Sequence, residues 1–256
     1  MSYAQAIISG IVQGITEFLP VSSSGHLVIL HNYFGYKEPQ LLYNIFLHTG
    51  TLFAVVVYFW KDIINVIAKE HKLLLAVIIA SIPTAFIGYF FKDIFESLFA
   101  NIIIVGIMLY ITAALLFLAD IAGKRQGNMA VTKNPGIFKS IIIGIVQGIS
   151  IIPGISRSGA TISSGMLLRI DKEVAVKFSF LLSIPAILGA LFLKLFDLKA
   201  GISYVPQMAL GTLFAFLFGL GAIYILIQTV IKGRLKFFAI YCLIAGTVAI
   251  LKGWLF

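Results

Sequence analysis

The first of two polar clusters in an otherwise apolar chain spans residues 13–26. It contains Gln13, Glu17, three successive serines at 22–24 and His26. Gln13 and Glu17 are four residues apart, so on a helix both side chains point into the same space. A carboxylate and an imidazole in an apolar segment predict a functional site, because ionisable groups are costly at membrane depth.

The second cluster, residues 153–161, predicts an anion site. Arg157 stands among the hydroxyl residues Ser156, Ser158 and Thr161, with a glycine on either side. A guanidinium forms bidentate hydrogen bonds with phosphate, and glycine lets the backbone approach a ligand. A helix predicted to begin directly after the cluster adds free N–H groups. Phosphate is therefore the expected anion.

Structural interpretations of the same residues remain open. Glu17 and Arg157 could pair only to hold helices together, and His26 alone could be a structural imidazole. The serines at 22–24 could serve as helix caps. Trp60, near the end of a predicted span, is interpreted as an interface anchor. Three further histidines have no partner at a helical spacing and are interpreted as structural or interfacial: His31, His48 and His71.

Composition predicts a membrane protein. Of the 256 residues, 60% are hydrophobic and 11% are charged, against roughly 25% charged residues in soluble domains. Six apolar blocks are long enough to cross a bilayer as helices. They lie at about 41–60, 73–91, 101–120, 174–196, 206–231 and 237–256. The net charge of +9 comes from basic residues in short loops between spans. This distribution indicates orientation in a membrane and not nucleic-acid binding.

Two other apolar stretches, about 3–33 and 137–168, are interrupted by the polar clusters. The first is not expected to be a removable signal peptide, since no basic residue precedes it and Glu17 lies within it. Cys242 is the single cysteine, which excludes an internal disulfide and a cysteine metal cluster.

An internal duplication relates the two halves of the chain. At an offset of 134 residues, six successive identities place residues 10–15 on 144–149. The match continues from 22–25 onto 156–159, where three of four residues are identical. Each half therefore carries one interrupted stretch followed by three spans.

Charge distribution orients the predicted spans. If both interrupted stretches are re-entrant, four loops that carry 13 of the 19 Lys and Arg residues share one side, which is then cytoplasmic. These loops are 61–72, 121–139, 169–177 and 232–236. Three spans per half invert the second half relative to the first, as in transporters. Both termini are then outside, and the polar turns meet near the midplane.

The predicted fold is thus an all-α polytopic membrane protein with an inverted-topology repeat. It has six full transmembrane helices and two re-entrant helix-turn-helix segments. Residues 1–256 are expected to form a single integral membrane domain, with repeats at about 1–122 and 135–256.

The two clusters resemble the motifs of the undecaprenyl-diphosphate phosphatase family, the BacA-type bacitracin-resistance proteins. The motifs read QGITEFLPVSSSGH at 13–26 and PGISRSGAT at 153–161, and the resemblance covers nearly the whole chain. It implies hydrolysis of a C55 isoprenyl diphosphate to the monophosphate, with a divalent cation. The reaction would occur at the outer face of the bacterial plasma membrane and recycle the lipid carrier for cell-wall polymers.

For this reaction we hypothesise roles for individual residues from their chemistry. The diphosphate would be held by five of them: Arg157, Ser156, Ser158, Thr161 and Ser22. Glu17 would hold Mg²⁺ or Ca²⁺ with Gln13 as a neutral oxygen ligand, because Gln13 stands where many members have glutamate. His26 would activate a nucleophile, either water or Ser23.

A rival interpretation is a flippase or transporter of a phosphorylated lipid or small anion, since inverted repeats with broken helices are typical of transporters. A structural scaffold is disfavoured, because it would not require Glu17 and Arg157 at membrane depth. The lipid bilayer and the isoprenyl diphosphate are the expected partners, nucleic acid is not, and a homo-oligomer is compatible with the sequence.

Overall fold

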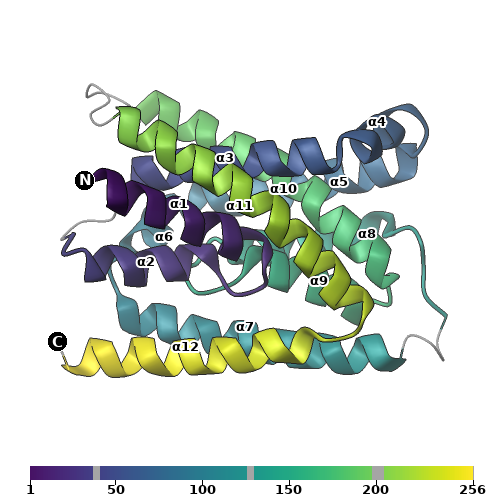
Figure 1. Cartoon of the computed structure of the whole chain (residues 1–256). Coiled ribbons are helices and arrows are strands. Elements are labelled where there is room, and N and C mark those ends of the chain that lie inside the picture. Colours follow the sequence, from purple (N-terminus) through teal and green to yellow (C-terminus); the bar gives the residue numbers. More distant parts are fainter. Residues whose placement is uncertain (37–40, 126–129, 198–204, 256) are drawn as a thin grey trace.

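The computed structural model describes residues 1–36, 41–125, 130–197 and 205–255 (Figure 1). In these ranges the regular structure is helical apart from one β-bridge between Thr132 and Ile170. The helices of the first half are α1 (Tyr3–Phe18), α2 (Ser23–Tyr33), α3 (Leu41–Tyr58), α4 (Trp60–Ala68), α5 (His71–Phe90), α6 (Lys92–Leu98) and α7 (Ile102–Arg125). Those of the second half are α8 (Gly136–Ile149), α9 (Arg157–Leu167), α10 (Lys172–Asp197), α11 (Val205–Ile231) and α12 (Leu235–Leu255).

Long apolar helices occur where the sequence predicts spans. Five are long and apolar enough to cross a membrane, namely α5, α7, α10, α11 and α12. A sixth arises if α3 and α4, which are bent by 69° relative to each other, count as one span. The prediction of a polytopic helical membrane protein is confirmed.

The connections differ from the prediction at two places. Residues 61–72 were expected to form a loop, but most of them belong to α4, which begins at Trp60. The linker after α5 contains the short helix α6. In α4 the apolar side chains of Trp60, Ile64 and Ile67 share one face and are exposed, whereas Val66, at the edge of this face, is buried in the core.

Each interrupted stretch forms two shorter helices separated by a break. In the first half α1 ends at Phe18 and α2 begins at Ser23, and in the second half α8 ends at Ile149 and α9 begins at Arg157. Helix α1 packs along α11, and α8 packs along α5. Each broken stretch is therefore held by a long helix of the other half.

Small residues permit this close approach. A methyl group added at Gly10 of α1 would collide with the Gly211 carbonyl of α11, and one added at Gly144 of α8 would collide with the Ala80 carbonyl of α5. Helices in membranes use such small residues because backbone contact replaces hydrophobic burial as the source of attraction. Two further long contacts between the halves join α3 to α11 and α7 to α12, and α7 and α12 lie side by side in Figure 1.

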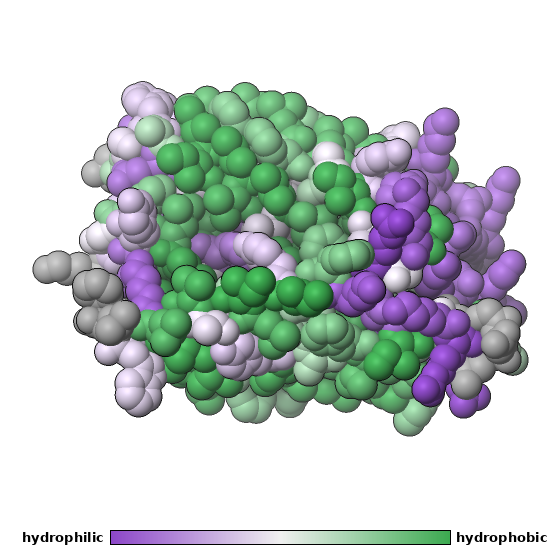
Figure 2. Space-filling view, turned by 60° about the horizontal axis from the view of Figure 1, so that its bottom comes forward, coloured by the Kyte–Doolittle hydropathy of each residue, from purple (hydrophilic) through white to green (hydrophobic). Residues whose placement is uncertain are grey.

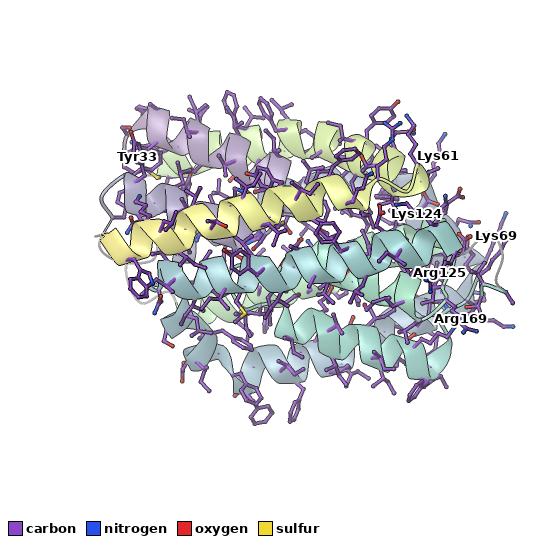
Figure 3. All side chains as sticks on the ribbon, turned by 90° about the horizontal axis from the view of Figure 1, so that it is seen from below. Tyr33, Lys61, Lys69, Lys124, Arg125 and Arg169 are labelled. Carbon is purple, nitrogen blue, oxygen red and sulfur yellow. The ribbon has the colours of Figure 1, made fainter. Side chains whose placement is uncertain are left out.

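Surface polarity follows the charge pattern of the sequence. Hydrophobic side chains cover the middle of the molecule, and hydrophilic ones gather mainly at one end (Figure 2). The basic side chains Lys61, Lys69, Lys124, Arg125 and Arg169 lie at this end, whereas Tyr33 lies at the other (Figure 3). The N-terminus and the end of α12 are at the end opposite the basic residues. Lys37 and Lys199 lie outside the described residues.

Candidate functional site

Equivalent serine caps start the second helix of each broken stretch. Ser22 Oγ accepts a hydrogen bond from Gly25 N (3.3 Å), and Ser156 Oγ accepts one from Gly159 N (3.1 Å). Each cap satisfies an N–H group that the first turn of a helix leaves free. Ser22 and Ser156 therefore act as helix caps, a role that the sequence predicted only for the serines at 22–24.

The two breaks are joined directly. Ser22 Oγ also accepts a hydrogen bond from Gly154 N (3.1 Å) of the other half. Thr112 of α7 holds the second break through two hydrogen bonds. Its Oγ1 accepts from Ser156 N (3.0 Å) and donates to Gly154 O (2.9 Å). Gly154 has φ +99°, a conformation that side-chain-bearing residues rarely adopt. The two sequence motifs thus form one turn-to-turn junction.

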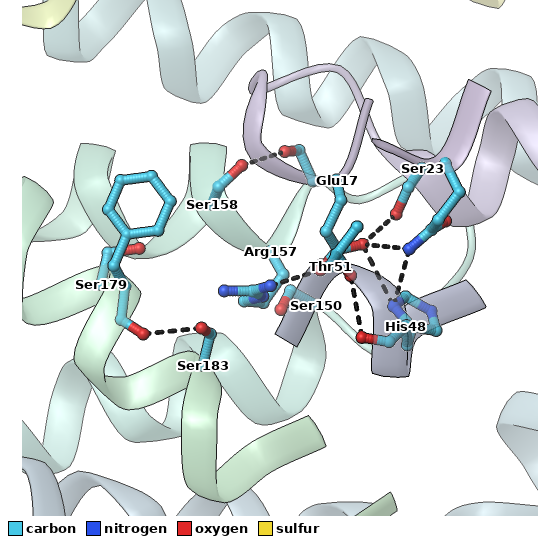
Figure 4. Close-up of polar contacts among 12 residues, drawn as sticks. Glu17, Ser23, His48, Thr51, Ser150, Arg157, Ser158, Ser179 and Ser183 are labelled. Atoms are coloured by element: carbon cyan, nitrogen blue, oxygen red, sulfur yellow. Dashed lines mark hydrogen bonds and ion pairs between the residues drawn. The ribbon is translucent and has the colours of Figure 1, made fainter. Parts of the chain in front are cut away.

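Glu17 is the centre of a buried polar cluster beside this junction (Figure 4). Its side chain is only 5% exposed, and its Oε1 pairs with the Arg157 guanidinium. Its Oε2 accepts hydrogen bonds from Ser23 Oγ (2.6 Å) and Gln13 Nε2 (3.0 Å). The structure therefore brings together four of the predicted site residues around one carboxylate.

Two atoms of this cluster have no partner among the described residues. They are Arg157 Nη1, a charged donor, and Gln13 Oε1, a neutral acceptor, and both are buried. A buried polar atom without a partner costs about 1–3 kcal/mol, so such atoms call for a ligand or water. A free guanidinium nitrogen fits an anion, whereas a free amide oxygen fits a cation or a donor.

The other predicted phosphate ligands are placed next to Arg157 at the start of α9. Ser158 Oγ lies 3.2 Å from Ser156 Oγ, and both residues are 1% exposed. Thr161 Oγ1 donates to Arg157 O (2.8 Å) and contacts Ser179 Oγ of α10 (2.6 Å). Each of these hydroxyls has a protein partner in the structure, and their contact with phosphate stays a prediction.

His26 bonds to groups other than Glu17. Its Nδ1 is 2.8 Å from Ser22 O and its Nε2 is 2.7 Å from the Tyr241 hydroxyl of α12. Because a carbonyl only accepts, Nδ1 carries the ring hydrogen and Nε2 accepts from Tyr241. The two rings also stack, with centroids 5.6 Å apart. The catalytic role of His26 stays a prediction. Nothing in the sequence around Tyr241 indicated that it would contact His26.

His48 of α3 belongs to the cluster, so its interpretation as a structural or interfacial histidine is wrong. Its Nδ1 lies 3.2 Å from Glu17 Oε2 and 2.9 Å from Gln13 Nε2. His48 is 31 residues from Glu17 in the chain, so no helical spacing linked the two. The polar type of His48 inside an apolar span was the one available signal.

The cluster offers oxygen ligands that fit a divalent cation whose remaining ligands are water and substrate phosphate. No group of three or more His, Cys, Asp or Glu side chains gathers within the described ranges. Glu17 offers a carboxylate, and Gln13 offers the unpartnered Oε1. Mg²⁺ typically takes one or two carboxylates together with water and substrate phosphates. A site of this kind needs no further protein ligand.

Comparisons with known proteins agree over the whole chain. A family model described as "Bacitracin resistance protein BacA" matches residues 6–248. Similar relatives named undecaprenyl-diphosphatase include one from Carboxydothermus hydrogenoformans, 43% identical over 98% of both chains. Another, from Halothermothrix orenii, is 40% identical over the full length of both chains. The chain belongs to the BacA family.

Proposed function

We propose that this protein hydrolyses undecaprenyl diphosphate to undecaprenyl phosphate and inorganic phosphate. The product is the lipid carrier for cell-wall polymers, and its recycling confers resistance to bacitracin. The relatives' common name supports this activity. The observation that carries the proposal is the ion pair of Glu17 with Arg157, whose Nη1 is free, at the junction of the two broken helices.

The first step is binding of the diphosphate. Arg157 offers Nη1 to a phosphate oxygen while its other nitrogen stays with Glu17. The start of α9 adds its dipole and N–H groups, and Ser158 adds a hydroxyl. The isoprenyl tail stays in the bilayer, since the surface around the molecule's middle is hydrophobic (Figure 2).

The second step is attack on the terminal phosphorus. Ser23 Oγ already donates to Glu17 Oε2 at 2.6 Å, so the carboxylate can take the proton as the oxygen bonds to phosphorus. The bond to the bridging oxygen then breaks, and undecaprenyl phosphate leaves with the electron pair. In the serine route, water must then attack the phosphoserine, which releases inorganic phosphate and restores the Ser23 hydroxyl. If water takes the place of Ser23 as the nucleophile, inorganic phosphate forms directly and no phosphoserine arises.

His26 lies one turn from Ser23 on α2. To act on the nucleophile, as the sequence predicts, its Nε2 must leave the Tyr241 hydroxyl. Tyr241 is 45% exposed, so bound substrate could displace its hydroxyl from His26.

Glu17 and Gln13 would hold a divalent cation, Mg²⁺ or Ca²⁺. When bound, the cation would neutralise charge that develops on the phosphate oxygens. Removal of divalent ions with a chelator is expected to abolish phosphate release, and addition of Mg²⁺ or Ca²⁺ to restore it. Full activity in excess chelator would exclude this role.

For the architecture we propose an inverted-topology repeat in a single membrane domain. The six spans would include the bent α3–α4 pair, and the two broken stretches would be re-entrant. The reciprocal contacts of α1 with α11 and of α8 with α5 support this arrangement. The basic end would face the cytoplasm of a bacterium, with both termini and the site's opening outside.

A transporter or flippase for phosphorylated lipid is the second candidate, favoured by the broken helices that meet inside an apolar molecule. Purified protein in detergent tests the choice with undecaprenyl or farnesyl diphosphate as substrate. We expect phosphate release that an Arg157→Ala variant lacks. No release above that variant, together with lipid movement across liposomes, would establish the transporter instead.

A further inference from the structure

His48 reaches the proposed catalytic carboxylate from a third helix. Glu17 lies on α1 and Arg157 begins α9, whereas His48 lies on α3 (Figure 4). The His48 side chain is 30% exposed, against 5% for Glu17. Its Nδ1 faces the cluster at 3.2 Å from Glu17 Oε2.

The remaining histidines have other neighbours. His26 bonds to Ser22 O and Tyr241, and His31 lies 3.4 Å from Ser9 Oγ and stacks on Tyr43. His71 begins α5 and is exposed. In the described structure, His48 is thus the imidazole that contacts Glu17.

His48 can hold Glu17 Oε2 in two ways, depending on which ring nitrogen carries the hydrogen. With the ring hydrogen on His48 Nε2, Gln13 Nε2 donates one hydrogen to Glu17 Oε2 and the other to His48 Nδ1. With the ring hydrogen on Nδ1, His48 donates to Glu17 Oε2 itself and no longer accepts from Gln13. In both, His48 and Gln13 together hold Oε2 on the side away from Arg157.

The position of Oε2 decides what Arg157 can do. A carboxylate and a guanidinium prefer a bidentate pair, in which both carboxylate oxygens take hydrogen bonds from two nitrogens. In this structure Oε1 alone meets Arg157, and Oε2 is held by Ser23, Gln13 and His48. A bidentate pair would occupy Nη1 and turn Oε2 away from Ser23.

We propose that His48 is a positioning residue that keeps Glu17 monodentate, and so leaves Arg157 Nη1 free for phosphate and keeps Oε2 on the Ser23 hydroxyl. This inference rests on the proposed function of the same site. It predicts that loss of His48 weakens both diphosphate binding and the chemical step, whereas a side chain with an amide N–H restores both.

The test compares His48→Leu, which removes the nitrogen, with His48→Asn and His48→Gln, which offer an amide. Phosphate release from farnesyl diphosphate gives kcat and KM. Titration of the purified protein with inorganic pyrophosphate gives a binding affinity without turnover. We expect His48→Leu to lower kcat/KM about 100-fold, the scale of a small misplacement in an active site. Its pyrophosphate affinity should fall about tenfold, and at least one amide variant should recover most of both losses.

His71→Leu is the matched control, because it makes the same change at an exposed histidine far from the cluster. Thermal unfolding in detergent checks that each variant folds. Wild-type kinetics and binding in His48→Leu would overturn the proposal, and so would amide variants no better than leucine in a folded protein. If the wild type releases no phosphate, the proposed function fails, yet the pyrophosphate comparison still tests His48.

Discussion

Arg157 and Glu17 form an ion pair across 140 residues of sequence, and the pair joins the two broken helices at a buried point. Glu17 uses one oxygen for Arg157 and the other for hydrogen-bond donors, so the pair is open on one side. Structural pairing and catalysis are compatible here, because Arg157 retains a free nitrogen.

Arg157→Ala is expected to lower phosphate release at least 100-fold, the usual loss when one donor to a developing anion is removed. It also leaves Glu17 buried and unpaired, so stability should fall by about 3–5 kcal/mol. Steady-state rates and thermal unfolding in detergent measure the two effects. Arg125→Ala, at the exposed basic end, is the control for loss of a positive charge. Equal activity of both variants would contradict the site.

Ser23→Ala is expected to reduce kcat about 100-fold, since it removes the hydroxyl that donates to Glu17. Acid quench of the wild type with substrate labelled in the terminal phosphate then separates the two nucleophiles. Label on Ser23 establishes the serine route, and its absence during turnover establishes water. A Ser23→Ala variant with wild-type kcat would remove Ser23 from the mechanism.

Gly154→Ala should destabilise the junction of the two motifs. The new methyl group would collide with the Val105 carbonyl and approach Met108 Cβ to 2.7 Å, in a backbone conformation with φ +99°. Strain and overpacking each cost about 1–3 kcal/mol. Gly233→Ala is the matched control, because φ is +63° there and nothing lies near the added methyl group. Melting in detergent should show the larger loss for Gly154→Ala, and equal losses would argue against tight contact at the junction.

Tyr241→Phe should keep at least a third of the wild-type rate of phosphate release. The variant retains the ring that stacks on His26 but frees His26 Nε2, the atom that catalysis is predicted to need. His26→Ala, in contrast, should lose about 100-fold. Equal losses in both variants would mean that the Tyr241 hydroxyl is itself required.

Cysteine labelling tests the orientation in the membrane. Native Cys242 is fully buried and should not react with an impermeant reagent. A cysteine at position 2 should be labelled from outside in intact cells, whereas cysteines at positions 70 and 234 should be labelled only after the cells are opened. Position 200, also predicted outside, lies beyond the described residues. The reverse pattern would place the site's opening on the cytoplasmic side.

The sequence by itself determined the features that depend on neighbours along the chain. Apolar length predicted the spans, and the polar clusters predicted both helix breaks. The run of serines at 22–24 predicted a helix cap, and Ser22 provides it. These features are local, because a helix cap or a span is set by residues within a few turns.

Tertiary structure alone decided which distant side chains meet. It placed His48 of α3 on Glu17 and Tyr241 of α12 on His26, and it turned α4 by 69° where the sequence suggested a loop. Such contacts depend on the packing angle and rotation of helices that are far apart in sequence. A spacing of three or four residues can reveal partners on one helix, but it carries no information about partners on two.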